Sequence, residues 1–110
     1  MSLAEPITQT YTVTTSNYNF AAHSIANVES FSLQVVSADA SGSDAALNLA
    51  LSNDGTNFDD IENSSKVVSS NGSKSWSVGK TDMLYVRAEV TASAGTVGLT
   101  LKWVFNIAVT

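Results

Sequence analysis

The sequence has no cysteine, one proline, one histidine and few charged side chains. Charged residues make up 14% of its 110 residues, with 10 acidic and 5 basic side chains. Without cysteine the chain offers no disulfide framework, no thiolate nucleophile and no cysteine-based zinc site. The hydrophobic content of 44% excludes a disordered tail, which combines low hydrophobicity with high net charge. We therefore expect one compact domain with a small core.

The scarcity of basic residues excludes several classes of partner. The formal charge is −5, and the basic residues are spread singly along the chain: Lys66, Lys74, Lys80, Arg87 and Lys102. Nucleic-acid binding needs clustered Lys and Arg, so nucleic acid is not an expected partner. The sequence lacks a run of about 18 apolar residues and the basic and apolar regions of a secretory signal. We expect a soluble protein with no membrane partner.

Hydroxyl and amide side chains take the place of the missing charges, and apolar side chains alternate with them. Ser and Thr supply 28 residues and Asn another 9. Between residues 97 and 107 every second position is apolar, which predicts a strand with one buried face. These positions are Val97, Leu99, Leu101, Trp103, Phe105 and Ile107.

Similar alternation predicts further strands, and the loops between them are rich in small residues. The further predicted strands span residues 10–15, 19–22, 30–35, 47–51, 58–61, 66–69, 74–78 and 84–91. About eight strands in this length predict an all-β antiparallel sandwich or barrel. A short helix would fit only in residues 21–27 or 39–47, and we expect none longer than one turn.

Two links carry residues that favour hairpin turns. Residues 92–96 contain Gly95, and residues 69–73 contain the pair Asn71-Gly72, whose tolerance of positive φ suits a tight turn. We therefore expect hairpins at both links. Pro6 lies outside every predicted strand, so we expect residues 1–10 to form an extended N-terminal arm and residues 11–110 to form the single sandwich domain.

Residues for acid–base or nucleophilic catalysis are nearly absent. His23 is the single histidine, and it lies in a segment that is predicted to cross between sheets, so a surface or locally hydrogen-bonded role is favoured over catalysis. No phosphate-binding loop or nucleophile elbow is present. We expect no enzymatic activity, no cofactor and no catalytic or metal-binding residue.

The densest acidic cluster comprises Asp54, Asp59, Asp60 and Glu62. Calcium sites use closely spaced carboxylates with a glycine at the bend, which Gly55 supplies, but the twelfth-position glutamate of an EF-hand is missing. In the alternative interpretation Asp54 and Asn57 bond their own backbone in a turn. The sequence leaves both interpretations open.

Aromatic side chains raise the alternative of a carbohydrate-binding or adhesion module, because exposed rings can stack on sugars. Trp103 is in phase with Leu101 and Phe105, so we expect it in the core. The phase of Trp76 leaves burial and exposure equally open, and Tyr85 lies on the same face as Arg87 and Glu89, which we expect to be wetter. The remaining candidates are Tyr11 and Tyr18.

Two motifs resemble small all-β structural domains of tailed bacteriophages and prophages. In the first, the strand over residues 47–51 leads into Ser52-Asn53-Asp54-Gly55 and then Asn57-Phe58. In the second, about 25 residues later, Tyr85-Val86-Arg87 opens a strand that is followed by Ser93-Ala94-Gly95-Thr96 and a final apolar strand. The order and spacing of both motifs fit the family, and the resemblance covers roughly residues 28–107.

The resemblance implies a jelly-roll-like or Ig-like sandwich within a virus particle, as a head decoration, a spike or a tail appendage. Such a protein is assembled in the cytoplasm of the bacterial host and acts by self-association as a homo-oligomer and by docking to other virion proteins. We expect residues 4–13 to contact a neighbouring subunit or the shell, with a disordered leader as the alternative. A surface glycan is the expected ligand of the alternative binding module.

Overall fold

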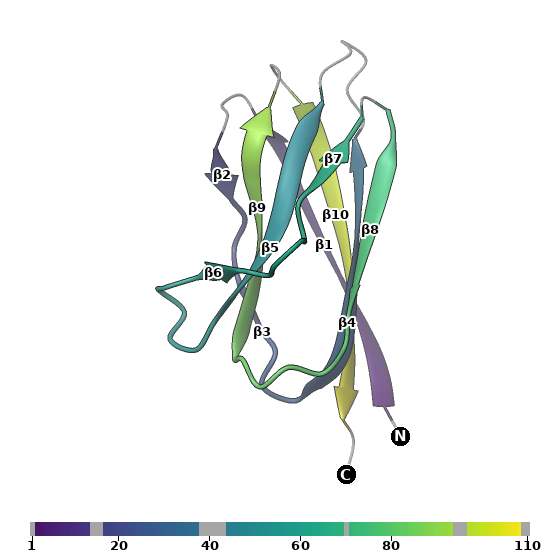
Figure 1. The fold of residues 1–110 in the computed structure, drawn as a ribbon. Coiled ribbons are helices and arrows are strands. Elements are labelled where there is room, and N and C mark those ends of the chain that lie inside the picture. Colours follow the sequence, from purple (N-terminus) through teal and green to yellow (C-terminus); the bar gives the residue numbers. More distant parts are fainter. Residues whose placement is uncertain (1, 14–16, 38–43, 70, 94–96, 109–110) are drawn as a thin grey trace.

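The computed structural model describes residues 2–13, 17–37, 44–69, 71–93 and 97–108, which form ten β-strands (Figure 1). Within these ranges there is no helix, and hence none that is long and apolar enough to cross a membrane. In chain order the strands are β1 (Ser2–Val13), β2 (Tyr18–Asn19), β3 (His23–Ser24), β4 (Val28–Ser37), β5 (Ala45–Ser52), β6 (Asp59–Asp60), β7 (Lys66–Val68), β8 (Ser73–Val78), β9 (Tyr85–Ser93) and β10 (Val97–Ala108).

The strands form two antiparallel sheets that face each other across the core. The first sheet has the order β1-β10-β4-β8. In the second sheet β9 and β5 are central; β2 and β3 both pair with β9, and β6 and β7 both pair with β5. The ten strands therefore fill eight positions, four in each sheet, as in a jelly roll. This confirms the predicted all-β sandwich of about eight strands.

The core lies between the sheets and follows the predicted alternation. On β10, Val97, Leu99, Leu101, Trp103 and Phe105 are all buried, and Ile107 packs against them half-buried. The predicted apolar positions on β4 and most of those on β5 and β9 are buried in the same way. There are two exceptions: Leu51 on β5 is half-buried, and Leu84, which precedes β9, is 42% exposed. Alternation therefore predicted the inward face correctly for the long strands.

The two predicted hairpins are wrong. The strands that flank residues 92–96 are β9 and β10, and they belong to opposite sheets; the same holds for β7 and β8 on either side of residues 69–73. Asn71 does have the expected positive φ of 57°, and Gly72 donates its N–H to the Ser69 carbonyl at 2.8 Å. The turn chemistry was therefore right and the strand partners were not, because a turn reverses the chain equally well within a sheet and between two sheets.

The expected N-terminal arm is not separate from the sandwich. Residues 2–13 are extended, as expected, but form β1, which pairs with β10 over its whole length. Pro6 therefore lies inside a strand, opposite Val104, contrary to the prediction. A proline is tolerated there because β1 is an edge strand. One side of an edge strand has no neighbouring strand, so a missing N–H on that side costs no hydrogen bond.

Candidate functional site

The described residues contain no group of three His, Asp, Glu or Cys side chains that is arranged to hold a metal ion. His23 on β3 and the acidic cluster beside β6 lie at opposite edges of the second sheet, with β9 and β5 between them. The structure therefore does not bring the single histidine together with the carboxylates.

Asp54 caps its own turn. Its Oδ1 accepts hydrogen bonds from the backbone N–H groups of Thr56 and Asn57 and from the Ser52 hydroxyl, each at 2.8 Å. Its Oδ2 accepts one from the side-chain amide of Asn57 at 2.8 Å. The two backbone N–H groups are the main reason that the pKa of Asp54 lies far below its usual value. The turn interpretation is thus confirmed for Asp54, whereas Asn57 uses its side chain to bond the carboxylate.

Replacing Asp54 should loosen this loop without unfolding the domain. In Asp54→Ala the amides of Thr56 and Asn57 lose their acceptor, so we expect their hydrogen exchange to become roughly tenfold faster. The melting temperature should hardly change, because the turn is exposed. Asp59→Ala is the matched control, since Asp59 is also an exposed acid. Unchanged exchange in Asp54→Ala, measured by NMR, would contradict this account.

The two motifs of the phage resemblance come together on the outside of the second sheet. The loop after β5 folds against β9, so that a methyl group added at Gly55 would lie 3.6 Å from the Tyr85 ring. Arg87 lies over the ring of Phe58 at 4.0 Å and donates to Glu89 at 2.8 Å. Gly55 has a φ of 75°, which explains why glycine stands there. Ala94, Gly95 and Thr96 of the second motif lie outside the described residues.

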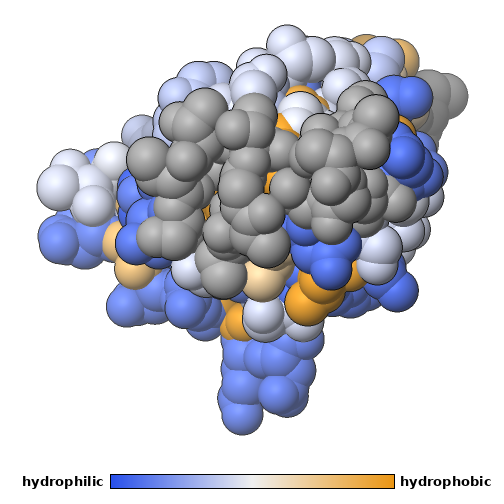
Figure 2. Space-filling model, turned by 90° about the horizontal axis from the view of Figure 1, so that it is seen from above, coloured by the Kyte–Doolittle hydropathy of each residue, from blue (hydrophilic) through white to orange (hydrophobic). Residues whose placement is uncertain are grey.

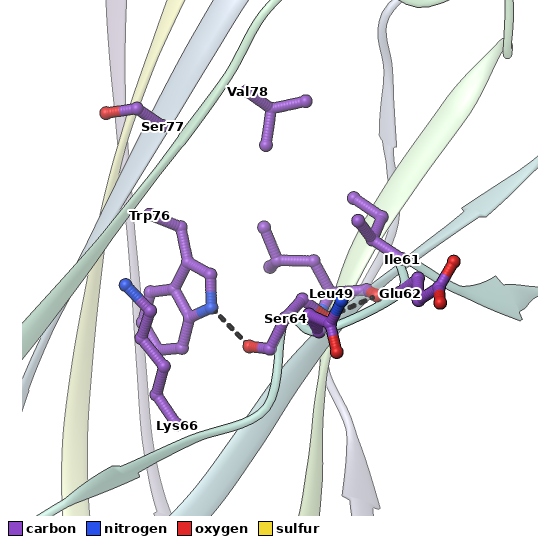
Figure 3. A pocket seen from close by; sticks show the side chains of 9 residues that line it. Leu49, Ile61, Glu62, Ser64, Lys66, Trp76, Ser77 and Val78 are labelled. Atoms are coloured by element: carbon purple, nitrogen blue, oxygen red, sulfur yellow. Dashed lines mark hydrogen bonds between the residues drawn. The ribbon is translucent and has the colours of Figure 1, made fainter.

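Neither tryptophan is a free platform for a sugar ring. Trp103 is fully buried, as predicted, and its indole N–H donates to Oε1 of Gln9 on β1 at 2.8 Å. Trp76 is 5% exposed, and its indole N–H donates to the Ser64 carbonyl at 2.6 Å (Figure 3). Lys66 lies over the Trp76 ring, with Nζ 5.3 Å from its centroid. The pocket beside Trp76 has a volume of about 230 Å³. It is therefore lined by a ring that is already packed and hydrogen-bonded.

The tyrosine candidates are also engaged. Tyr85 is half-buried against the Gly55 turn, so it is drier than the sequence predicted. Tyr11 stacks on Tyr18 with centroids 3.9 Å apart, and Phe20 meets both rings edge-on. This cluster connects β1 of the first sheet with β2 of the second.

His23 lies half-buried between the sheets, on the same side as that cluster. Its ring lies 5.1 Å from the Trp103 ring and 5.4 Å from the Phe105 ring, and its Nε2 has no hydrogen-bond partner among the described residues. His23 and Glu5 of β1 line one pocket together. Burial lowers the pKa of His23 below its usual 6.5, because desolvation disfavours the imidazolium ion. The histidine is a packing residue.

This burial makes the stability of the fold pH-dependent. The unfolded chain takes up a proton near pH 6.5 and the folded chain only at lower pH, so stability is full above pH 6.5 and falls as the pH drops below it. We expect the melting temperature to fall between pH 7.5 and 5.5, and His23→Gln to remove most of that slope. A slope that persists in His23→Gln, measured by calorimetry, would show that another group is responsible.

The four edges of the sandwich differ in length and protection. Both edges of the second sheet are broken into strands of 2 or 3 residues. On the β8 edge, Lys66 donates to the Ser75 carbonyl at 2.6 Å, and Lys74 is exposed beside it. Short edge strands and edge lysines both disfavour pairing with another chain. The remaining edge, β1, is 12 residues long and carries a single charged side chain, Glu5.

The pairing pattern shows which backbone groups of β1 point to the open side. In an antiparallel sheet the N–H and C=O of one residue face the same neighbour, and successive residues alternate. Ser37 donates to Gly72 at the β8 side, so Gln34 faces β10. Its partner Lys102 then faces β4, and Thr8, which is paired with Lys102, faces away from β10.

The same alternation turns Pro6, Thr10 and Thr12 to the open side with Thr8. These three threonines offer N–H and C=O groups that have no strand partner among the described residues. Pro6 offers only a carbonyl, which is consistent with its place in this phase. The sequence predicted a contact with a neighbouring subunit or the shell over residues 4–13, but it did not predict that residues 2–9 belong to a strand with an open edge.

Two of the four exposed large apolar side chains among the described residues lie on β1, and the other two are Val67 on β7 and Leu84 before β9. Leu3 is 61% exposed and Tyr11 is 42% exposed, and both are on β1.

At the end of the sandwich far from the chain termini, the described atoms are mainly hydrophilic, with small separate hydrophobic areas (Figure 2). The outer face of the first sheet is mostly hydroxylated, and its polar members are Thr8, Thr10, Thr12, Ser30, Ser32, Gln34, Ser73, Ser75, Ser77, Thr100, Lys102 and Asn106.

Comparison with known proteins finds the fold but not a family. No family model matches the chain, and no curated protein matches it. Among solved structures, the PBSX exported protein XepA matches with a TM-score of 0.72 at 9% identity, over 98% of this chain and 38% of XepA. The chain therefore spans much less than half of XepA.

Two further structures match over nearly their whole length. The SPBc2 prophage-derived protein YomS has a TM-score of 0.63 at 9% identity, over 96% of both chains. A protein of the Bacillus endospore appendages, which form disulfide-linked pili, has a TM-score of 0.59 at 16% identity, over 97% of this chain and 89% of that one. The jelly-roll fold is thus shared with prophage and pilus proteins, and none of the three is described as an enzyme.

Proposed function

We propose that the chain is a non-enzymatic structural component of a bacteriophage or prophage particle, as a head decoration, spike or tail appendage. It acts by self-association and by docking to other particle proteins. The observation that carries this proposal is the β1 edge: 12 residues, one charge, and outward backbone groups at Thr8, Thr10 and Thr12 without a strand partner among the described residues.

The fold and the chemistry of the surface support the proposal. The fold is shared with two prophage proteins and with a protein that forms pili. The appendage pili are described as disulfide-linked, whereas this chain has no cysteine, so the proposed contacts between its copies do not include disulfides. Copies of the chain and other particle proteins are the proposed partners, in place of nucleic acid, membrane or cofactor, and the virion is the proposed location.

The carbohydrate-binding alternative has less support. Both tryptophans are buried, Tyr85 packs on a turn, and Tyr11 has one face covered by Tyr18. Each of these rings is therefore engaged in packing.

Light scattering coupled to size-exclusion chromatography tests the proposal directly. The wild-type chain should form an oligomer at high micromolar concentration. Thr10→Pro should shift it toward the monomer, because proline removes an outward N–H and leaves the β10 ladder intact. Thr10→Ser, which keeps the N–H, should assemble like the wild type. A wild-type chain that stays monomeric at millimolar concentration would refute self-association, and glycan binding by that monomer would favour the alternative function.

A further inference from the structure

The part of β1 best suited to meet another chain is residues 7–13. This segment, Ile7-Thr8-Gln9-Thr10-Tyr11-Thr12-Val13, carries no charge and contains three β-branched threonines on one face. Two copies that each carry a charge of −5 repel each other, so they approach at least cost where both surfaces are neutral. The segment also has high β-propensity and no proline.

The outward backbone groups define a register. In an antiparallel pair centred on Thr10, Thr8 of one copy opposes Thr12 of the other, and Thr10 opposes itself. All three residues turn N–H and C=O toward the partner, so each opposing pair exchanges two hydrogen bonds. A centre at Thr8 would instead oppose Pro6 to Thr10 and lose a donor. Centring on Thr10 places both Pro6 and Glu5 beyond the paired segment.

We propose that β1 pairs with β1 of a second copy about a two-fold axis through Thr10. This rests on the proposed self-association and names its partner and its register. The first sheet of one copy then joins the first sheet of the other into one continuous antiparallel sheet. The side chains of Thr8, Thr10 and Thr12 of both copies lie on its outer face. Tyr11 of each copy lies opposite Gln9 of the other on the inner side.

The β8 edge is a poorer partner for β1. Its outward carbonyl at Ser75 already accepts a hydrogen bond from Lys66 at 2.6 Å, so a new strand has to displace a charged donor. β8 is also only 6 residues long. Pairing of like edges closes after two copies, as in most homo-oligomers.

Cysteine cross-linking tests the register, because the chain has no cysteine of its own. In the proposed pair the two Thr10 Cα atoms are about 5.5 Å apart, within the range that a disulfide spans. Thr10→Cys should therefore form a disulfide-linked dimer in a glutathione buffer. The two Thr8 positions would be about 14 Å apart along the strands, so Thr8→Cys alone should form about tenfold less dimer.

A mixture of Thr8→Cys and Thr12→Cys chains should cross-link with each other, since these residues oppose one another. All three positions are exposed, so the variants should keep the wild-type circular dichroism spectrum, which is recorded first. A Thr8→Cys dimer that forms as readily as the Thr10→Cys dimer would overturn the register. An oligomer by light scattering that none of the cysteines cross-link would overturn the β1 interface and leave the proposed function standing, whereas a monomeric wild type would overturn both.

Discussion

Leu101→Asp should abolish the cooperative unfolding transition of this domain. Leu101 is fully buried on β10, between β1 and β4 in the first sheet. A carboxylate there would lie within the hydrophobic core, and burying an unpaired charge costs several kcal/mol even after relaxation. Domains of this size are stable by only about 5–15 kcal/mol, so most or all of the stability is lost.

Gln34→Asp is the matched control for this substitution. Gln34 is exposed on the neighbouring central strand, opposite Lys102, and its replacement adds the same negative charge on the outer face. This variant should unfold cooperatively near the wild-type temperature. Circular dichroism melts of both variants decide the matter: a stable Leu101→Asp would mean that the faces of β10 are assigned the wrong way round.

Trp103→Ala should lower the free energy of unfolding by about 3–5 kcal/mol, the usual cost of truncating a buried large aromatic side chain. The Trp103 ring is fully buried, stacks on Phe105 at a centroid distance of 5.5 Å and meets His23 edge-on. Its indole N–H also ties the core to β1, through Gln9. Gln9 in turn donates to the Ala21 carbonyl at 3.2 Å, so one side chain connects β10, β1 and the segment between β2 and β3.

Trp103→Phe separates packing from hydrogen bonding. Phenylalanine keeps an aromatic ring in the core but leaves Oε1 of Gln9 without its donor, which should cost about 1–3 kcal/mol. Urea denaturation followed by circular dichroism gives both values. If Trp103→Ala lowers the free energy of unfolding by less than 1 kcal/mol, or by no more than Trp103→Phe does, the packing of the ring does not stabilise the core.

Local chemistry was enough to predict several parts of this structure. The faces of β4 and β10 followed from alternation, because successive side chains in a strand point to opposite sides whatever the strand's partners are. The Asp54 turn was one of the two interpretations that the sequence left open, and it rests on the tendency of aspartate to accept hydrogen bonds from the backbone two and three residues ahead. Both features depend on residues close together in the sequence.

Local chemistry did not predict that residues 2–9 belong to an edge strand. Pro6 and the weak alternation of residues 2–9 do not look like a central strand, and they are not one. Their pairing partner, β10, begins about 90 residues later in the chain. A contact over residues 4–13 was expected, but the open backbone edge could be recognised only after the sheet order had shown that β1 is an edge and that the other three edges are short or protected by lysine.

The sequence by itself determined that this is a small, cysteine-free, all-β domain with few charges, and it determined which side chains face inward on its long strands. Only the tertiary structure decided that β9 and β10, and likewise β7 and β8, lie in opposite sheets, and that the single histidine and Trp76 belong to the packing. The physical reason is that the period of two specifies the face of each strand, whereas its partners are chosen by the packing of the whole sandwich.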